Sequence, residues 1–316
     1  MNKFKKIGLS ALAGSLVAVS ANAGEMSVAG SASMAVEHVN GGAASTGKSW
    51  SMGNQLTFTG GGELDNGMNV TLSFILDEAD PTPGPFDSHS LAVSMDGLGT
   101  LKFHGEGGGS AVGDMDGSAA GGVWDSFQAA ADEPKSGKSS DDMLTYAAPT
   151  LYEGLALNAS YTPGGIGFGG KASSTSWSAT YTGVEGLTVA YGTGEDNSAA
   201  VEATATAWKV AYAYGPITVT ATDLEYDHGT DTSDRDMESQ AISYTISDEL
   251  SVTYGVEEIT DGSASSEKAE FESISASYVS GGMTLTVSSQ EAKNHSYSTT
   301  ATEDNERWAI SAAFAF

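Results

Sequence analysis

Large apolar residues alternate with small polar ones along most of this chain. Near its end, Trp308, Ile310 and Phe314 fall on one face, while Arg307 and Ser311 fall on the other. A period of two is the mark of a β-strand with two different faces. The same alternation recurs in residues 26–36, 70–76, 217–222, 242–247, 250–256 and 283–288. The pattern predicts an all-β protein in which each strand has one apolar face and one small, hydroxyl-rich face.

Turn residues divide these strands into hairpins. Short connections are predicted at residues 64–67, 96–97, 149–154, 183–186, 215–216, 247–249 and 280–282. Longer polar segments occur at residues 40–48, 77–88, 105–142, 163–170, 192–199, 227–236, 258–268 and 292–306. Short and long connections therefore alternate along the chain. This alternation indicates hairpins with tight turns at one end of the sheet and longer loops at the other end. Seven short and eight long connections join about sixteen strands in up-and-down order.

This arithmetic favours a transmembrane antiparallel β-barrel of about sixteen strands over a soluble β-sandwich. A sandwich needs a second sheet to cover each apolar face, and its loops have no systematic short and long sides. Tyrosine and tryptophan recur near strand ends, which is typical of an interfacial girdle, although packing explains each aromatic residue alone equally well. The chain also ends on Phe316 in an alternating strand. We expect this last strand to pair with the first and close the ring.

The N-terminus has the layout of a secretory signal peptide. Lys3, Lys5 and Lys6 precede an apolar run over residues 7–19, and Ala21-Asn22-Ala23 forms a small-x-small cleavage site. The run is shorter than the roughly 20 residues that a spanning helix needs. We therefore expect a signal peptide at residues 1–23 and a single barrel domain at residues 24–316.

Composition narrows the choice of partners. The chain has no cysteine, so disulfides cannot stabilise it after export. Its formal charge of −28 becomes −31 once the three signal lysines are removed. Nucleic acid is excluded as a partner, because phosphate binding needs clustered lysine and arginine. The acidity either keeps the protein soluble in salty surroundings or lines a path for cations.

The whole mature chain resembles the sixteen-stranded general porins of Gram-negative outer membranes, and most closely the alphaproteobacterial type. The specific features are the terminal Phe316, the segment Tyr146-Ala-Ala-Pro149 leading through Gly154 into a strand that ends at Tyr161, and a very long third loop. The loop lacks the Pro-Glu-Phe-Gly-Gly sequence of enterobacterial porins, so loop positions cannot be transferred.

The resemblance implies several properties of the protein. It implies a homotrimer in the outer membrane, in contact with lipid and lipopolysaccharide, that passes ions and small hydrophilic solutes by passive diffusion. In this family the terminal phenylalanine is the signal read by the barrel assembly machinery, which assigns that role to Phe316. The family also implies that the third loop folds into the barrel and narrows it.

The third loop, residues 105–142, therefore supplies one side of the predicted constriction. We expect Asp114, Asp116 and Asp125 to approach the pore axis, and Trp124 and Phe127 to anchor the loop, with a short helix over residues 123–131. A structureless loop of this length is usually functional or disordered. Each of these aspartates has the alternative of being an ordinary solvated surface charge.

Strand parity supplies the other side of the constriction. It points Lys102, Lys209 and Arg307 inward, because their neighbours Phe103, Trp208 and Trp308 take the lipid face. His104 shares the parity of Lys102. Acid opposite base would create a transverse field across the lumen. With only about ten basic residues in the mature chain, taken from thirteen less the three in the signal, we expect a mild cation preference.

Other signals carry less weight. The stretch from Gly165 to Gly170 matches G-x-G-x-x-G but lacks the strand and helix of a dinucleotide site. The scattered histidines have no metal-ligand spacing, so no metal site and no cofactor are predicted. Calcium on the external acidic loops stays open as an alternative, because Asp223, Glu225, Asp227, Asp231, Asp234 and Asp236 cluster in sequence.

Two other functions stay open. Outer-membrane proteases and lipases also use barrels, although we do not expect an enzyme here, because the chain has no Gly-x-Ser-x-Gly motif. Such an enzyme would need a Ser/His or Asp/His pair at the barrel rim. The other alternative is a non-channel, β-rich adhesin, which would give no conductance.

Overall fold

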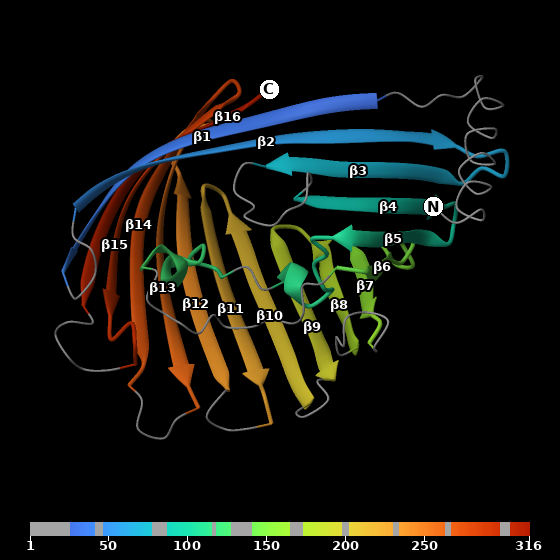
Figure 1. Ribbon diagram of the computed structural model, residues 1–316. Helices are drawn as coiled ribbons and strands as arrows, with labels where there is room; N and C mark the ends of the chain where they lie inside the picture. Colours follow the sequence, from blue (N-terminus) through green and yellow to red (C-terminus); the bar gives the residue numbers. More distant parts are fainter. Residues whose placement is uncertain are drawn as a thin grey trace, which may run out of the picture.

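The computed structural model describes residues 26–41, 47–77, 87–115, 118–127, 141–164, 173–197, 202–229, 234–262, 267–297 and 304–316, with Asp114 described in its backbone only. The predicted signal peptide at residues 1–23 lies outside these ranges. Within them the chain forms a closed barrel in which every strand is antiparallel to both of its neighbours. The fold class predicted from the alternation is confirmed (Figure 1).

The barrel has sixteen strands in simple chain order. They are β1 (Met26–Gly41), β2 (Gly47–Glu63), β3 (Asn69–Asp77), β4 (Ser88–Met95), β5 (Gly99–Glu106), β6 (Met143–Ala147), β7 (Leu155–Thr162), β8 (Ser173–Val184), β9 (Leu187–Asn197), β10 (Glu202–Tyr214), β11 (Ile217–Asp227), β12 (Arg235–Thr245), β13 (Leu250–Asp261), β14 (Ala269–Ser280), β15 (Met283–Lys293) and β16 (Asn305–Ala315). Two short 3₁₀ turns, η1 (Gly113–Met115) and η2 (Val123–Phe127), interrupt the loop between β5 and β6. No helix among the described residues is long and apolar enough to cross a membrane.

The seven short connections all lie at one end of the barrel, because they alternate with the longer ones along an up-and-down sheet. Glycine makes several of them possible. Gly186, between β8 and β9, has a φ of +73°, and a Cβ there would lie 2.4 Å from the carbonyl oxygen of Ala213. Any other residue would combine a strained backbone with a backbone clash. The alternation of turns and loops predicted from the sequence is confirmed.

The outer face of the strands is apolar over most of its height. On β12, Ile242 and Tyr244 point outward and are about half exposed, whereas Ala241 and Ser243 point into the barrel. Exposed aromatic residues recur around the outer face, including Tyr161, Trp177, Tyr191, Trp208, Tyr212, Tyr254 and Tyr278. An apolar outer band with aromatic rings fits a surface solvated by lipid, and closure pairs the backbone groups that lipid cannot satisfy.

Above this band, toward the long loops, the outward positions of β11 to β15 become acidic. The register places Asp223 opposite Glu238, and Glu238 opposite Glu258. Lys268 partly offsets this charge by donating to Glu258 at 2.8 Å, and that hydrogen bond raises the pKa of the Lys268 ammonium. Facing carboxylates repel one another unless water and counterions screen them. The acidic rim therefore marks where the outer face leaves the apolar zone.

The first strand pairs with the last, as the sequence predicts. The pairing runs from Ser31 opposite Ala315 to Gly41 opposite Asn305. The terminal residue extends it, because Gly30 N donates to Phe316 O at 2.7 Å and Phe316 N donates to Gly30 O at 2.9 Å. Phe316 thus supplies the last rung of the seam that closes the barrel.

This rung gives a test of the seam. A Cβ on Gly30 would lie 2.4 Å from Cε2 of the Phe316 ring, so Gly30→Ala should displace the ring and destabilise the barrel by about 1 kcal/mol, the low end of overpacking costs. Because Phe316 is 74% exposed and its ring can turn aside, about 1 kcal/mol is the upper bound of this cost. The measurement is the temperature at which the folded band disappears from a gel. Gly60→Ala on β2 is the matched control, since a Cβ there meets no atom within 4 Å. Equal shifts for both variants would contradict this role of Gly30.

The main buried apolar cluster lies inside the barrel, between the wall and the loop that follows β5. Val112, Met115, Val123 and Phe127 come from the loop. The wall supplies Ala190, Ala205, Ala207, Leu224, Met237, Ile259, Ala269, Phe271 and Ala292. Because burial of apolar surface stabilises contacts in proportion to area, this cluster holds the loop inside the barrel.

Candidate functional site in the barrel lumen

The loop between β5 and β6, called the third loop here, follows the inner wall. Figure 1 shows its two short turns in green inside the ring of strands. Turn η1 contacts β9 and β10, and turn η2 contacts β13, β14 and β15. Hydroxyl groups of the wall accept from the loop backbone: Ser160 from Ala111 at 3.2 Å, Ser176 from Val112 at 3.4 Å, Thr222 from Ala119 at 3.0 Å and Ser239 from Ala120 at 3.0 Å. The inward folding expected of this loop is therefore present in its described part.

Glu257 on β13 accepts three hydrogen bonds from the loop, more than any of the hydroxyl groups named above. Its side chain is buried, with 1% of the residue exposed. Oε1 accepts from Gly122 N at 2.9 Å and from the Ser118 hydroxyl, and Oε2 accepts from Trp124 N at 3.0 Å. A buried carboxylate is costly unless it is hydrogen-bonded, and here the loop supplies all three donors. Glu257 therefore fastens the loop on both sides of η2's first residue.

Small residues on the wall let the loop approach closely. A Cβ on Gly255 would lie 2.5 Å from Cβ of Ala120, and one on Gly192 would lie 2.9 Å from Sδ of Met115. A larger residue at position 255 would move the loop backbone at Ala120, and one at position 192 would displace the side chain of Met115. Glycines at inward positions of strands were thus a readable signal for close backbone approach, and the sequence interpretation did not use it.

The aromatic anchors expected in the loop take their predicted place. Phe127 is buried and its ring lies 6.1 Å from the ring of Phe271 on β14. Trp124 packs partly against the same cluster. The helical segment expected from residue 123 is a 3₁₀ turn over Val123–Phe127, and its predicted end near residue 131 lies outside the described residues.

The three loop aspartates are placed to different extents. Asp125 is exposed on η2. Asp114 lies in η1, with its side chain outside the description, and Asp116 lies outside the described residues. Their predicted role on the loop side of a constriction therefore stays a prediction.

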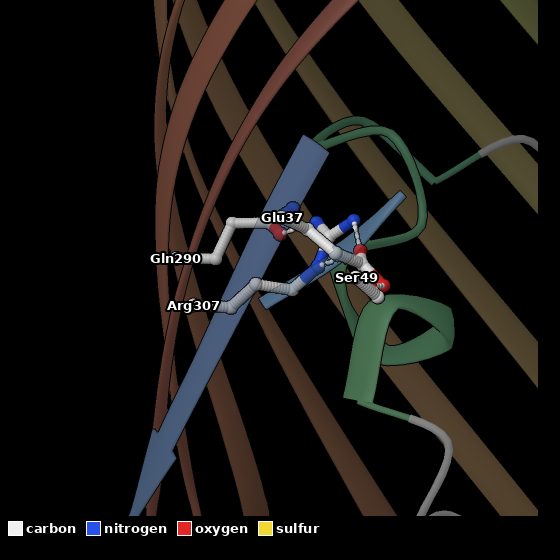
Figure 2. A network of polar contacts seen from close by, with 4 residues as sticks. All are labelled: Glu37, Ser49, Gln290 and Arg307. Atoms are coloured by element: carbon white, nitrogen blue, oxygen red, sulfur yellow. Dashed lines mark hydrogen bonds and ion pairs between the residues drawn. The ribbon is translucent and has the colours of Figure 1, made fainter. Parts of the chain in front are cut away.

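Arg307 faces the lumen from β16, as its parity predicts, but it does not carry a free charge. Its Nε donates to Oε2 of Glu37 on β1 at 2.9 Å, and Nη1 donates to Gln290 on β15. Ser49 on β2 donates to Oε1 of Glu37 at 2.9 Å. Figure 2 shows these four side chains meeting inside the barrel, where the first two and the last two strands join. The charge of Arg307 is neutralised by a partner that the sequence interpretation missed. Inward parity could have given the direction of the Glu37 side chain, but not its pairing with Arg307.

Lys102 and His104 lie together on β5, on the inner face. His104 is nearly buried, and its Nε2 lies 3.2 Å from Oγ1 of Thr145 on β6. Lys102 is partly exposed, and none of the described carboxylates forms an ion pair with it. Of the cations expected on the wall, Lys102 thus keeps its charge available to solutes in the lumen.

Lys209 lies on the wall that the third loop covers. The register pairs it with Thr222 on β11, and Thr222 accepts from the loop residue Ala119. Its neighbour two residues earlier, Ala207, is fully buried under the loop. Lys209 therefore faces the lumen beside the loop.

The acidic residues considered for calcium do not converge in the described part of the chain. No group of three or more carboxylate or histidine side chains there is arranged to hold a metal ion. Asp223 and Glu225 project outward from β11, and Asp234 instead accepts from the backbone of His228 at 2.9 Å. Asp231 lies outside the described residues, so calcium binding in this loop stays untested.

A closed barrel with an inward loop fastened to one wall has the geometry of a channel, and comparisons with known proteins agree. The sequence matches the Gram-negative porin family over residues 8–316. The chain belongs to this family. This porin is therefore an outer-membrane protein that forms a channel, with transmembrane β-strands. None of the curated proteins matches it in sequence.

Solved structures share the fold of this porin at low sequence identity. A loop-deletion mutant of OmpT, an outer membrane protein of Vibrio cholerae, is 14% identical with a TM-score of 0.69, over 93% of this chain and 100% of that one. The anion-selective porin of Comamonas acidovorans is 13% identical with a TM-score of 0.69, over 92% and 99%. A triple mutant of the Rhodopseudomonas blastica porin is 15% identical with a TM-score of 0.67, over 92% and 100%. At these identities the likeness concerns the fold alone.

Proposed function

We propose that this porin is a passive diffusion channel for ions and small hydrophilic solutes, with a mild preference for cations. The observation that carries the proposal is the path of the third loop. The described attachments of the loop lie on β7 to β15, which supports an aqueous passage between the loop and the opposing wall of β16 and β1 to β5. A barrel of about sixteen strands is too wide for side chains to fill.

The preference for cations rests on charge. The chain carries 41 acidic and 13 basic residues, and Glu37 neutralises Arg307 in the lumen. Asp125 is exposed on the loop, and carboxylates line the outer rim above the apolar band. A negative potential at the entrance concentrates cations and repels anions. One neighbour in structure is named an anion-selective porin, so selectivity in this fold depends on the residues of each chain.

Bilayer recordings test this proposal. The reversal potential in a KCl gradient should show that cations permeate more readily than anions at neutral pH. The preference should weaken at about 1 M salt, where the Debye length falls to about 3 Å and entrance charges are screened. Anion preference would contradict the proposed selectivity. Absence of any conductance would instead contradict the channel and favour the adhesin or enzyme alternatives.

Assembly is the second part of the proposal. We infer a homotrimer, as porins generally form, inserted by the barrel assembly machinery through Phe316 and surrounded by lipid and lipopolysaccharide. The large exposed apolar residues on the outer face of β1 and β2, such as Met34, Trp50 and Met52, support a partner surface there. A heat-sensitive trimer band on a gel, together with stepwise conductance, is the expected result. A monomer that conducts would overturn the trimer while leaving the channel intact.

A further inference from the structure

A recess of about 260 Å³ lies in the inner wall beside the start of the third loop, just after the end of β5. Four polar side chains line it, namely Lys102, His104, Thr145 and Asn158, and the loop contributes Gly109 and Ala111. The channel proposed above needs only an open lumen. A pocket in the wall beside that lumen, with several convergent polar groups, is a candidate binding site in addition to the channel.

The register of three strands builds the recess. Lys102 on β5 lies directly opposite Thr145 on β6, and Ala147 on β6 lies opposite Asn158 on β7. The loop side is fixed as well, because Ala111 N donates to Ser160 Oγ at 3.2 Å. Ser160 also lies 2.6 Å from Ser176 on the next strand. The walls of the recess are thus rigid parts of the barrel and its loop.

The polar groups of the recess are mostly hydrogen-bond donors. Lys102 has three N–H donors and Asn158 has an amide with two. The Thr145 hydroxyl lies 3.2 Å from His104 Nε2. In the tautomer that carries its proton on Nε2, His104 donates to Thr145 and leaves the threonine O–H free to donate into the recess. An anion in the recess would favour this tautomer, because the Thr145 O–H could then donate to the anion.

The charge of the recess contrasts with that of the chain. Lys102 brings a positive charge, and none of the described residues that line the recess is acidic. The protein as a whole has 41 acidic and 13 basic residues. In such a chain, a pocket with a lysine and no carboxylate is unlike its surroundings. It would offer an anion that has entered the lumen a place to bind.

We propose that this recess is a binding site for small oxyanions, that is, phosphate or carboxylate groups of solutes passing through the channel. Lys102 supplies the charge, and Thr145 and Asn158 supply neutral donors. A recess of about 260 Å³ has room for a phosphate or carboxylate group. Lipid phosphates cannot reach the recess, because it opens into the lumen. The site rests on the proposed channel function and adds a solute class to it.

The test uses the full protein in planar bilayers. Conductance in KCl is titrated with inorganic phosphate at constant ionic strength, and wild type should show a saturable fall. Lys102→Gln should raise the half-saturating phosphate concentration at least about tenfold, which corresponds to about 1.4 kcal/mol, because the variant loses a charge-assisted hydrogen bond to the anion. Thr145→Val should raise it by a smaller factor. Succinate should show the same dependence on Lys102.

Lys209→Gln is the matched control, because it removes the same charge from the lumen outside the recess. Whatever it does to conductance, it should leave the half-saturating phosphate concentration within about twofold of wild type, since each factor of two is only about 0.4 kcal/mol. Equal losses in the two lysine variants, or no loss in Lys102→Gln, would overturn the site. A channel that conducts in KCl without any response to phosphate refutes the site alone. A protein that does not conduct in KCl refutes the channel itself.

Discussion

Replacing Glu257 with alanine should give channels with a higher and noisier conductance than wild type. The carboxylate accepts from Gly122 and Trp124, which flank the first residue of η2, and from Ser118 earlier in the loop. Without it, the backbone N–H groups of Gly122 and Trp124 lose their acceptor, whereas the Ser118 hydroxyl keeps Ser239 Oγ at 3.0 Å. A donor left unsatisfied on burial costs about 1–3 kcal/mol, so the loss of this acceptor for two half-buried donors should weaken the loop's attachment by about 2 kcal/mol. Single-channel recording measures the outcome directly.

The physical reason for a wider passage is that the loop is held by a few discrete contacts. The apolar cluster around Phe127 and Phe271 remains in the variant, so the loop should detach intermittently and not permanently. Intermittent release predicts flicker between the wild-type level and a larger one. Faster cleavage of the loop by added protease, with the barrel still folded, should accompany the flicker.

Two variants make this test specific. Glu257→Gln keeps the shape and one acceptor oxygen but turns an amide toward the other donors, so an intermediate effect is expected. Glu258→Gln changes the same charge on the next residue, which points outward and pairs with exposed Lys268. Loss of an exposed pair costs at most about 1 kcal/mol and should not alter conductance. A quiet, wild-type conductance in Glu257→Ala would show that the carboxylate does not hold the loop.

The barrel could be predicted from the sequence because its determinants are local. Alternation over a few residues gives each strand its two faces, and glycine turns such as the one at Gly186 mark the short connections. Counting the strands between these connections gives sixteen. In an up-and-down barrel of sixteen strands, the first strand must pair with the last one to close the ring. These inferences need no knowledge of which side chains meet across the lumen.

The contacts within the lumen could not be predicted in the same way. Glu37 and Arg307 are 270 residues apart, and only the closed register brings them together. Glu257 and Trp124 are 133 residues apart and meet because the loop crosses the inside of the barrel. Parity correctly gave the inward direction of Arg307, but it did not reveal a carboxylate beside it. Direction is a property of one strand, whereas pairing depends on the whole ring.

The pair formed by Glu37 and Arg307 leads to the second large effect, a shift of ion selectivity in opposite directions. Glu37→Gln leaves Arg307 as a free cation in the lumen and should shift selectivity toward anions. Arg307→Gln frees the carboxylate of Glu37 and should shift selectivity toward cations. Two unit charges about 10 Å apart in water interact by about 0.4 kcal/mol, so the permeability of each ion should change about twofold, in opposite directions for cation and anion. The permeability ratio should therefore change about fourfold in each variant. Reversal potentials in a KCl gradient measure both shifts.

The double variant Glu37→Gln/Arg307→Gln decides whether the two residues act as a pair. With both charges removed, selectivity should return close to that of wild type, although each single variant departs from it. Stability should change little, because removing both partners of this half-buried pair leaves no unpaired charge behind. Glu306→Gln, which removes an outward charge next to Arg307, should shift the reversal potential less than Glu37→Gln does. Shifts of the same sign in both single variants would mean that the two charges do not offset each other in the lumen.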